Sequence, residues 1–261
     1  MKYCMDRSEN IPGAGCGQPG PHPEIALPRP LFSGTLIKRY KRFLADVKLC
    51  GGRVVTAHCP NSGSMKTCSA PGSRVMISRA SSESRRTRWT WELILVGRIW
   101  VGTNTLLPNR LVEKALRAQL LPEFSDWHFV RREAPLGPDS RIDFLLERND
   151  RPCYVEVKNV TMVSDGIAYF PDAVTTRGSK HLEALMRAAD DGCRACMLYL
   201  IQRSDGTSLR PAETIDAHYA ETLRRAVQNG VEALAYRSVV TLQRVSIAER
   251  VPIDLGVSII S

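Results

Sequence analysis

Two acidic residues and a lysine lie in two neighbouring segments of the chain that both have the pattern of β-strands. Asp143 stands in the first segment, and Glu156 and Lys158 alternate with valines in the second. Because successive side chains of a strand point to opposite faces, Glu156 and Lys158 share one face and the valines share the other. We expect the valines to face the core and the charged pair to face a cleft or solvent.

These residue types suit phosphodiester hydrolysis assisted by a divalent cation. Two carboxylates on adjacent strands can hold a hard ion such as Mg²⁺ or Mn²⁺ through oxygen, and the carbonyl of Val157 can add a third ligand. The ion would polarise the phosphate and lower the pKa of a water molecule, while Lys158 positions that water or stabilises developing charge. The catalytic candidates are therefore Asp143, Glu156 and Lys158.

A purely structural interpretation of the same residues is a salt bridge. Lys158 would then pair with Asp143 or Glu156 across the strands, as charged neighbours in a sheet often do. The spacing alone leaves both interpretations open. The context of the two strands, and the order of the elements around them, favours the functional one.

The elements of the second half of the chain predict an α/β domain with a mixed sheet, over residues 104–261. A helix is expected at Leu111–Leu120, followed by strands, a helix from Asp172 to just before Gly192, a buried strand and a helix over Asp216–Asn229. The expected strands are Phe129–Ala134, Arg141–Leu146, Cys153–Val160, Ala195–Ile201, Glu232–Tyr236 and a terminal pair. A helix-turn-helix around Ala226 and Gly230 is the less favoured alternative to the strand at Glu232.

Residues 31–103 predict a small all-β domain, for which an OB-like barrel is the usual size match. Five short strands are expected, at residues 43–49, 54–57, 74–78, 87–96 and 99–103. Phe43 opens the first alternating run and is assigned to the core; Trp89 and Trp91 are likewise favoured as core over a stacking surface. Residues 1–30 are rich in Pro and Gly and are expected to form a flexible leader.

The positive charge is concentrated in the predicted barrel. The chain has 36 basic and 27 acidic residues, a net charge of +9, and residues 31–100 carry 13 basic against 3 acidic residues. Such segregation favours an anionic partner, most often nucleic acid. Four basic residues can neutralise phosphates: Lys38, Arg39, Lys41 and Arg42. Tyr40, which lies between them, can stack on a base.

Further nucleic-acid contacts are predicted from a loop and a helix. In the loop from His58 to Met65, Asn61 and Ser62 can assist an anion-binding nest of backbone N–H groups. On the helix after the catalytic strand, the basic side is expected to border the metal site. The helix residues assigned to this border are Arg177, Lys180 and His181, and Arg141 is a further predicted nucleic-acid contact.

The eight cysteines are interpreted as free thiols of a cytoplasmic protein, since the N-terminus lacks an apolar export signal. Structural zinc at Cys193 and Cys196, or at His58, Cys59 and Cys68, is the less favoured alternative. No apolar stretch is long enough for a membrane helix, so a membrane partner is not expected. A homo-oligomer is left open.

Five separated segments, in order, resemble the sugar fermentation stimulation protein A (SfsA) family. They are residues 38–46, 58–65, 140–145, 154–161 and 170–178. The resemblance implies an OB-like N-terminal domain, a C-terminal domain like the PD-(D/E)xK nucleases, and DNA binding without marked sequence preference. It also makes Glu133, where the family pattern has an acid, a further candidate metal ligand. Ile142 occupies the place of the proline that usually precedes the first acid of the nuclease motif.

Two functional hypotheses follow. The first is a divalent-metal-dependent phosphodiesterase acting on nucleic acid, most simply DNA, with a barrel that binds the backbone and a second domain that cuts it. The second is a non-catalytic, largely sequence-independent DNA-binding protein that acts as a regulator of sugar metabolism. The intact pair of acids and the lysine favour the enzyme.

Overall fold

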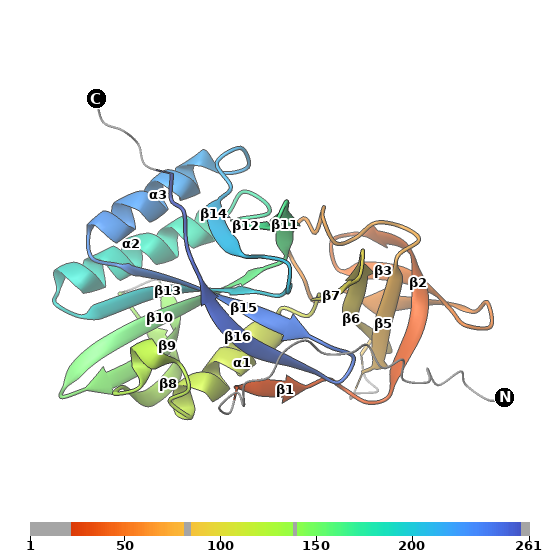
Figure 1. Ribbon diagram of the computed structural model, residues 1–261, viewed down its shortest axis with the longest axis horizontal. Coiled ribbons are helices and arrows are strands. Elements are labelled where there is room, and N and C mark those ends of the chain that lie inside the picture. Colours follow the sequence, from red (N-terminus) through yellow and green to blue (C-terminus); the bar gives the residue numbers. More distant parts are fainter. Residues whose placement is uncertain (1–21, 81–84, 138–139, 257–261) are drawn as a thin grey trace.

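A closed β-barrel forms the first domain of the computed structural model, which describes residues 22–80, 85–137 and 140–256 (Figure 1). Its strands follow the ring order β4-β3-β2-β5-β6, and β4 closes the ring by pairing in parallel with β6. This is the strand arrangement of an OB-fold. The five strands are β2 (Leu31–Tyr40), β3 (Leu44–Leu49), β4 (Val54–His58), β5 (Arg74–Arg79) and β6 (Trp89–Val96).

The predicted five-stranded OB-like barrel is confirmed, but its strand list needs a correction. The long strand β2 was missed, and β7 (Ile99–Gly102) pairs only with β6 outside the closed ring. Phe43 was wrongly assigned to the core: the buried run starts at Ala45, and the Phe43 ring is 44% exposed. Trp91 is fully buried as predicted, whereas Trp89 is only partly covered.

The second domain is built on a seven-stranded mixed sheet with the order β1-β16-β15-β13-β10-β9-β8. The central strands β10, β13 and β15 run parallel, and their outer neighbours are antiparallel. The strands are β1 (Glu24–Ala26), β8 (His128–Pro135), β9 (Arg141–Arg148), β10 (Arg151–Val160), β13 (Arg194–Ile201), β15 (Glu232–Val240) and β16 (Arg244–Val251). A small second sheet is formed by β11 (Met162–Ser164), β12 (Ile167–Phe170) and β14 (Ser208–Pro211).

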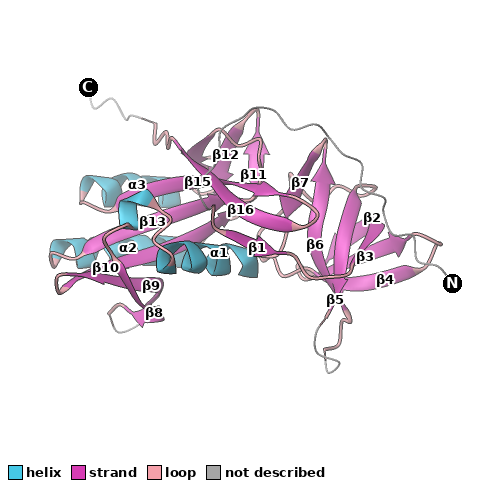
Figure 2. Cartoon of the chain, turned by 60° about the horizontal axis from the view of Figure 1, so that its bottom comes forward, coloured by secondary structure: helices cyan, strands magenta, loops and turns pink. Residues whose placement is uncertain are grey.

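Helices cover both faces of the large sheet (Figure 2). Helix α1 (Leu106–Arg117) packs on one face, where its leucines join Val155 and Val157 in one apolar cluster. Helices α2 (Thr176–Asp190) and α3 (Ala217–Gln228) cover the other face with a second cluster. Val155 and Val157 therefore face α1, and Glu156 and Lys158, which alternate with them, face α2.

The first described residues do not form a free leader. Strand β1 pairs antiparallel with β16, so that Ile25 lies opposite Val245. Leu27 is buried in the cluster under α1. The prediction of a flexible leader is thus wrong for this stretch, because an apolar Ile-Ala-Leu run follows the prolines; residues 1–21 lie outside the described part of the chain.

Two helix boundaries test local sequence signals. Helix α3 begins after Asp216, whose carboxylate accepts a hydrogen bond from the Tyr219 N–H, as predicted. Helix α2 begins later than predicted, because Thr175 caps it and the Asp172 carboxylate accepts a hydrogen bond from the Met65 N–H instead. Strand β15 follows α3, so no helix-turn-helix forms there.

Among the described residues, no helix has both the length and the apolarity needed to cross a membrane.

Candidate metal and nucleic-acid site

Asp143 and Glu156 meet between strands β9 and β10, where the two strands separate. The ladder between them ends at the pair Phe144 and Val155. Beyond it, the Val157 N–H donates to Asp143 Oδ2 at 2.8 Å, and the Asp143 N–H donates to Glu156 Oε2 at 3.2 Å. The carboxylates of Asp143 and Glu156 thus accept hydrogen bonds from the backbone N–H groups that the interrupted ladder leaves without partners, and the two carboxylates lie close together.

The carbonyl of Val157 faces the same gap. The carbonyl of Val160 accepts a bond from Gln202, at the end of the neighbouring parallel strand β13. The backbone N–H and C=O groups of successive residues point alternately toward the two neighbouring strands. The backbone groups of Val157 therefore point toward β9, as the hydrogen bond from its N–H to Asp143 shows. The Val157 carbonyl, the predicted third oxygen ligand, therefore points to the side of β10 on which Asp143 lies.

Lys158 and His181 hold the other side of Glu156. Lys158 Nζ donates to Glu156 Oε1 at 2.6 Å, and His181 Nδ1 contacts the same oxygen. Arg177 Nε donates to His181 Nε2 at 3.2 Å. Lys158 Nζ also lies 3.2 Å from His181 Nδ1, so that Glu156, Lys158, His181 and Arg177 form one connected network. The salt bridge considered in the sequence analysis thus exists, but within a larger network.

The two carboxyl groups have opposite pKa shifts. Burial, with the nearby charge of Glu156, raises the pKa of Asp143 to about 7. Burial also acts to raise the pKa of Glu156, but Lys158 and His181 outweigh it and lower that pKa below its ordinary value. Glu156 is therefore ionised. Asp143 forms no ion pair within the described residues, and the charge of Lys158 only partly offsets the rise of its pKa.

The donor set suits a hard cation rather than zinc. Carboxylate and carbonyl oxygens are the ligands of Mg²⁺, Mn²⁺ and Ca²⁺. Within the described residues, no group of three or more His, Cys, Asp or Glu side chains is arranged to hold a metal. A cation here would rely on Asp143, Glu156 and the Val157 carbonyl. Glu133 is exposed and close enough to raise the pKa of Asp143, but no hydrogen bond joins it to the pair.

A cleft of about 590 Å³ opens beside this site. Glu133 lies on its wall, and His181 connects the wall to the acidic pair. Three residues predicted to contact nucleic acid, Arg141, Arg177 and Lys180, line the same cleft. His181 also lines the cleft, but it is only 5% exposed and both its ring nitrogens contact other side chains, Arg177 and Glu156.

The basic segment of the barrel divides into exposed and structural residues. Lys38, Lys41 and Arg42 are exposed. Arg39 instead donates to the carbonyls of Asn61, Gly63 and Ser64 at 2.8 to 3.0 Å, and so shapes the loop after β4. We therefore assign Arg39 a structural role in place of a phosphate contact.

Tyr40 and the loop residues show the same division. The Tyr40 hydroxyl donates to Asp46 at 3.1 Å, and Lys38 Nζ lies 5.2 Å from the centre of its ring. Asn61 is 3% exposed and accepts a bond from the Gly63 N–H, so it forms an internal turn. Ser62 is exposed and remains a candidate contact.

The loop after β4 joins the two domains, which the sequence did not indicate. Asp172 accepts a hydrogen bond from the Met65 N–H at 3.0 Å, and Thr105 donates to the Pro60 carbonyl. Four residues after Thr105, Asn109 donates to Asp143 Oδ1 at 2.7 Å. Asn109 was missed because only the fold brings α1 to β9.

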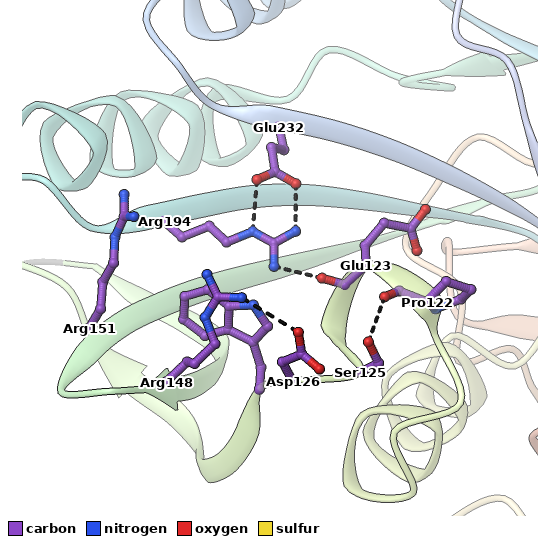
Figure 3. A pocket seen from close by; sticks show the side chains of 9 residues that line it. Pro122, Glu123, Ser125, Asp126, Arg148, Arg151, Arg194 and Glu232 are labelled. Carbon is purple, nitrogen blue, oxygen red and sulfur yellow. Dashed lines mark hydrogen bonds and ion pairs between the residues drawn. The ribbon is translucent and has the colours of Figure 1, made fainter.

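A second cavity, of about 380 Å³, lies at the opposite ends of the central strands (Figure 3). Arg194 donates two hydrogen bonds to Glu232 at 2.7 Å and one to the Glu123 carbonyl. Arg148 pairs with Asp126 at 3.7 Å. Because these charges are paired with one another, this cavity presents less free charge than the cleft, and we assign it no function.

The cysteines with described positions carry no disulfide. They are Cys50, Cys59, Cys68, Cys153, Cys193 and Cys196. Burial raises the pKa of Cys68 to about 11 and that of Cys153 to about 12, so these thiols are protonated. Cys4 and Cys16 lie outside the described residues.

Comparisons with known proteins agree with the two-domain arrangement. The model described as "SfsA N-terminal OB domain" matches residues 37–103, and the "Sugar fermentation stimulation protein RE domain" matches residues 106–244. Homologues of the sugar fermentation stimulation protein are 52% identical in Geobacter sulfurreducens, over 89% of this chain and 100% of the relative, and 53% identical in Syntrophotalea carbinolica, over 88% and 100%.

A solved structure supports the same fold. The structure of Pyrococcus furiosus SfsA in complex with Ca²⁺ is similar to this chain, with a TM-score of 0.82 and 24% sequence identity. The match covers 90% of this chain and all of the other. By both domain matches and by relatives above 50% identity along their full length, the chain belongs to the sugar fermentation stimulation protein family.

Proposed function

We propose that this protein is a divalent-metal-dependent phosphodiesterase that acts on nucleic acid, most simply DNA. One observation carries the proposal: Asp143 and Glu156 meet at the point where β9 and β10 separate, and Lys158 lies beside them. Two close carboxylates, one of which lacks a positive partner, are favourable only with a proton or a cation between them.

The roles of the residues follow from their positions. Asp143, Glu156 and the Val157 carbonyl would hold Mg²⁺ or Mn²⁺, with Glu133 as a further ligand from the cleft wall. The bound ion polarises a phosphate oxygen and lowers the pKa of water. Lys158 stabilises charge that develops on the phosphate, and His181 keeps Glu156 in place. The Ca²⁺ named for the Pyrococcus furiosus relative supports a site for divalent cations.

We further assign the second domain to the PD-(D/E)xK class. Its element order is α1, β8, β9, β10, α2 and β13, with the small hairpin β11–β12 inserted before α2. The acids and the lysine stand on the second and third strands of this unit, as the residues of that motif do. Ile142, which stands in place of the usual proline, is a buried core residue of β9.

Nucleic acid is the substrate that fits the surroundings of the site. Arg141, Arg177 and Lys180 supply cations along the cleft, and the barrel adds a large basic surplus. Phosphodiester backbones are bound chiefly through such neutralisation. A small sugar substrate would not need charges spread over two domains.

The test compares Asp143→Asn with the wild type on labelled DNA and RNA, with Mn²⁺, Mg²⁺ or EDTA. The substitution keeps the shape of the side chain but removes one charge, so metal affinity measured by calorimetry and cleavage should both fall steeply, by orders of magnitude for cleavage. DNA binding should survive. Asp126→Asn, at a carboxylate that is 75% exposed, is the matched control and should change neither.

Two results would overturn the proposal. Equal metal affinity in the wild type and Asp143→Asn would remove Asp143 from the site. Binding of DNA by the wild type, with no cleavage under any metal condition, would favour the non-catalytic DNA-binding protein instead.

A further inference from the structure

An exposed aromatic pair lies at one end of the barrel. The Phe43 ring is 44% exposed although it belongs to a residue type that is usually buried. It stacks on the imidazole of His58, with ring centres 6.3 Å apart and an angle of 26° between the planes. One face of the pair is thus already ordered by the protein, and much of Phe43 remains in contact with solvent.

The backbone fixes this pair rigidly. Phe43 follows a tight turn in which Lys41 and Arg42 have left-handed backbone angles of 47° and 62°. Its carbonyl accepts a hydrogen bond from the Cys59 N–H, next to His58. Two non-glycine residues in this conformation cost energy, so the turn is held by its surroundings rather than by local preference.

Positive charge surrounds the pair. Lys41 and Arg42 are exposed and form no ion pair within the described part of the chain. Arg85, from the loop between β5 and β6, donates to Thr90, the residue paired with His58 across the sheet. Partial burial and the charge of Arg85 lower the pKa of His58, so its ring is neutral near pH 7.

The other aromatic residues of the barrel are less suited to contact a ligand. Trp91 is fully buried, and Trp89 packs edge-on against Phe32 with Arg79 over its ring. The hydroxyl of Tyr40 is bonded to Asp46. Phe43 therefore combines an accessible face, a fixed orientation and cationic neighbours.

We propose that Phe43, backed by His58, is a stacking platform for an unpaired base, and that the barrel prefers single-stranded nucleic acid. The proposal deepens the proposed function, on whose nucleic-acid substrate it rests. Aromatic rings bind bases of single strands with little sequence preference, while nearby cations hold the backbone. In a duplex the base faces are covered by their neighbours, so the ring would find no partner.

The platform is also connected to the acidic site through a chain of contacts. The chain runs from His58 directly into the loop that contacts Thr105 and Asp172 of the second domain. From Thr105, helix α1 leads to Asn109, which binds Asp143. A strand held at Phe43 is thereby held by a segment that is anchored beside the site.

The experiment measures binding by fluorescence anisotropy in EDTA, where no cleavage occurs. The first probe is a single-stranded thymidine oligomer of about a dozen nucleotides, which is long enough to span an OB-fold site. The second is the duplex of this oligomer with its complementary adenosine strand, and the third is an abasic oligomer of equal length. Phe43→Leu keeps an apolar side chain but removes the ring, and Phe43→Trp keeps a ring. Val54→Ala, at another exposed apolar residue on β4, is the control.

We expect Phe43→Leu to weaken binding of the single strand by about fivefold or more, the value of one base stacked on one ring. Binding of the duplex and of the abasic oligomer should change less than about twofold, within ordinary variation for surface substitutions. Phe43→Trp and Val54→Ala should bind like the wild type. Quenching of the new indole by the thymidine oligomer, and not by the abasic one, would show the contact directly.

The outcomes separate this inference from the proposed function. If Phe43→Leu leaves the single strand unaffected, or weakens all three probes equally, the platform is wrong while nucleic-acid binding stands. If the wild type binds none of the probes, the nucleic-acid substrate fails and the platform with it. If the expected pattern appears in a protein that never cleaves, the platform stands and the catalytic proposal fails.

Discussion

At the scale of single residues, the environment of Asp143 disfavours the charged form of its carboxyl group. It is surrounded by Glu156, Glu133 and buried apolar residues, and its hydrogen bonds come from Asn109 and from the backbone of Val157. Neutral donors offset part of the cost of burying a charge, but not all of it. The carboxyl group therefore keeps its proton to a much higher pH than an exposed aspartic acid does.

Metal-free protein should accordingly lose stability as the pH rises. The pKa of Asp143 is raised to about 7 from an ordinary value of 3.8, so its stabilising contribution is complete below pH 3.8 and is lost as the pH rises through about 7. The lowered pKa of Glu156 acts in a different window, below its ordinary value of 4.5. In EDTA, the free energy of unfolding of the wild type minus that of Asp143→Asn should fall between pH 5 and pH 8.

Urea unfolding at several pH values measures this difference. The corresponding difference for Asp126→Asn, at an exposed carboxylate, should stay flat over the same range. A flat difference for Asp143→Asn as well would show that Asp143 is not perturbed in the folded protein.

At the scale of elements, the core of the second domain depends on a short strand from the start of the described chain. Strand β1 extends the sheet beyond β16, and Leu27 then enters the apolar cluster beneath α1. Lys114 of α1 donates to the Glu24 carbonyl at 2.9 Å. This segment, which precedes the barrel in sequence, therefore belongs to the second domain in space.

Leu27→Ala should therefore destabilise the protein by about 2–5 kcal/mol, the usual cost of a cavity in a core. Val130→Ala, at a side chain that is 47% exposed, should cost less than about 1 kcal/mol. Chemical denaturation measures both values. Equal, small effects would mean that residues 24–27 contribute no packing, and would restore the flexible leader.

The loop after β4 packs tightly against the second domain at Gly63, which leads to a second prediction at this scale. A Cβ atom at Gly63 would lie 2.5 Å from the carboxylate oxygens of Asp172, which also bind the Met65 N–H. Gly63→Ala should displace that carboxylate and destabilise the protein by about 1–3 kcal/mol, as overpacking does. In an Asp172→Ala background the same substitution should cost much less, because the clash is absent.

Unfolding of the two single variants and the double variant gives the coupling between the sites. Ser62→Ala, one residue earlier at an exposed side chain, is the control and should be close to neutral. Strictly additive effects of Gly63→Ala and Asp172→Ala would contradict the contact between the domains.

At the scale of the whole molecule, the charge is divided between two tasks. The barrel carries the surplus of positive charge, while the second domain is close to neutral overall and holds two of its carboxylates, Asp143 and Glu156, side by side. Under the proposed function, this separation would let a polyanion bind along one domain while a cation is held in the other. Arg39 is an exception, because its charge is used on three backbone carbonyls of a loop.

Binding of DNA should therefore depend on salt through the exposed cations of the barrel. Each phosphate contact contributes about 0.9 to the slope of log affinity against log salt concentration for duplex DNA. Replacing Lys38, Lys41 and Arg42 with alanine should reduce that slope by about 2–3. A control that removes the same charge from three exposed residues of the second domain, Arg151, Arg187 and Arg225, should leave the slope unchanged. Equal slopes in the two triple variants would contradict this assignment.

The sequence by itself determined the elements whose signals are local. Alternation around Ala45 and Val47 indicated a half-buried strand, Asp216 indicated the start of α3, and the continuous apolar run at Ala195–Ile201 indicated a central strand. Period and capping depend on neighbours a few residues apart, so they are visible in a linear chain. The five-stranded barrel and the mixed sheet followed from the order of such elements.

The tertiary structure alone decided which side chains meet. Asn109 reaches Asp143, His181 reaches Glu156 and Arg39 reaches the loop at Asn61, in each case across 22 or more residues. Phe43 has the residue type and spacing of a core position, yet the strand begins after it and the ring is left exposed. Burial and pairing at these positions depend on contacts between distant segments, and no periodic pattern encodes such contacts.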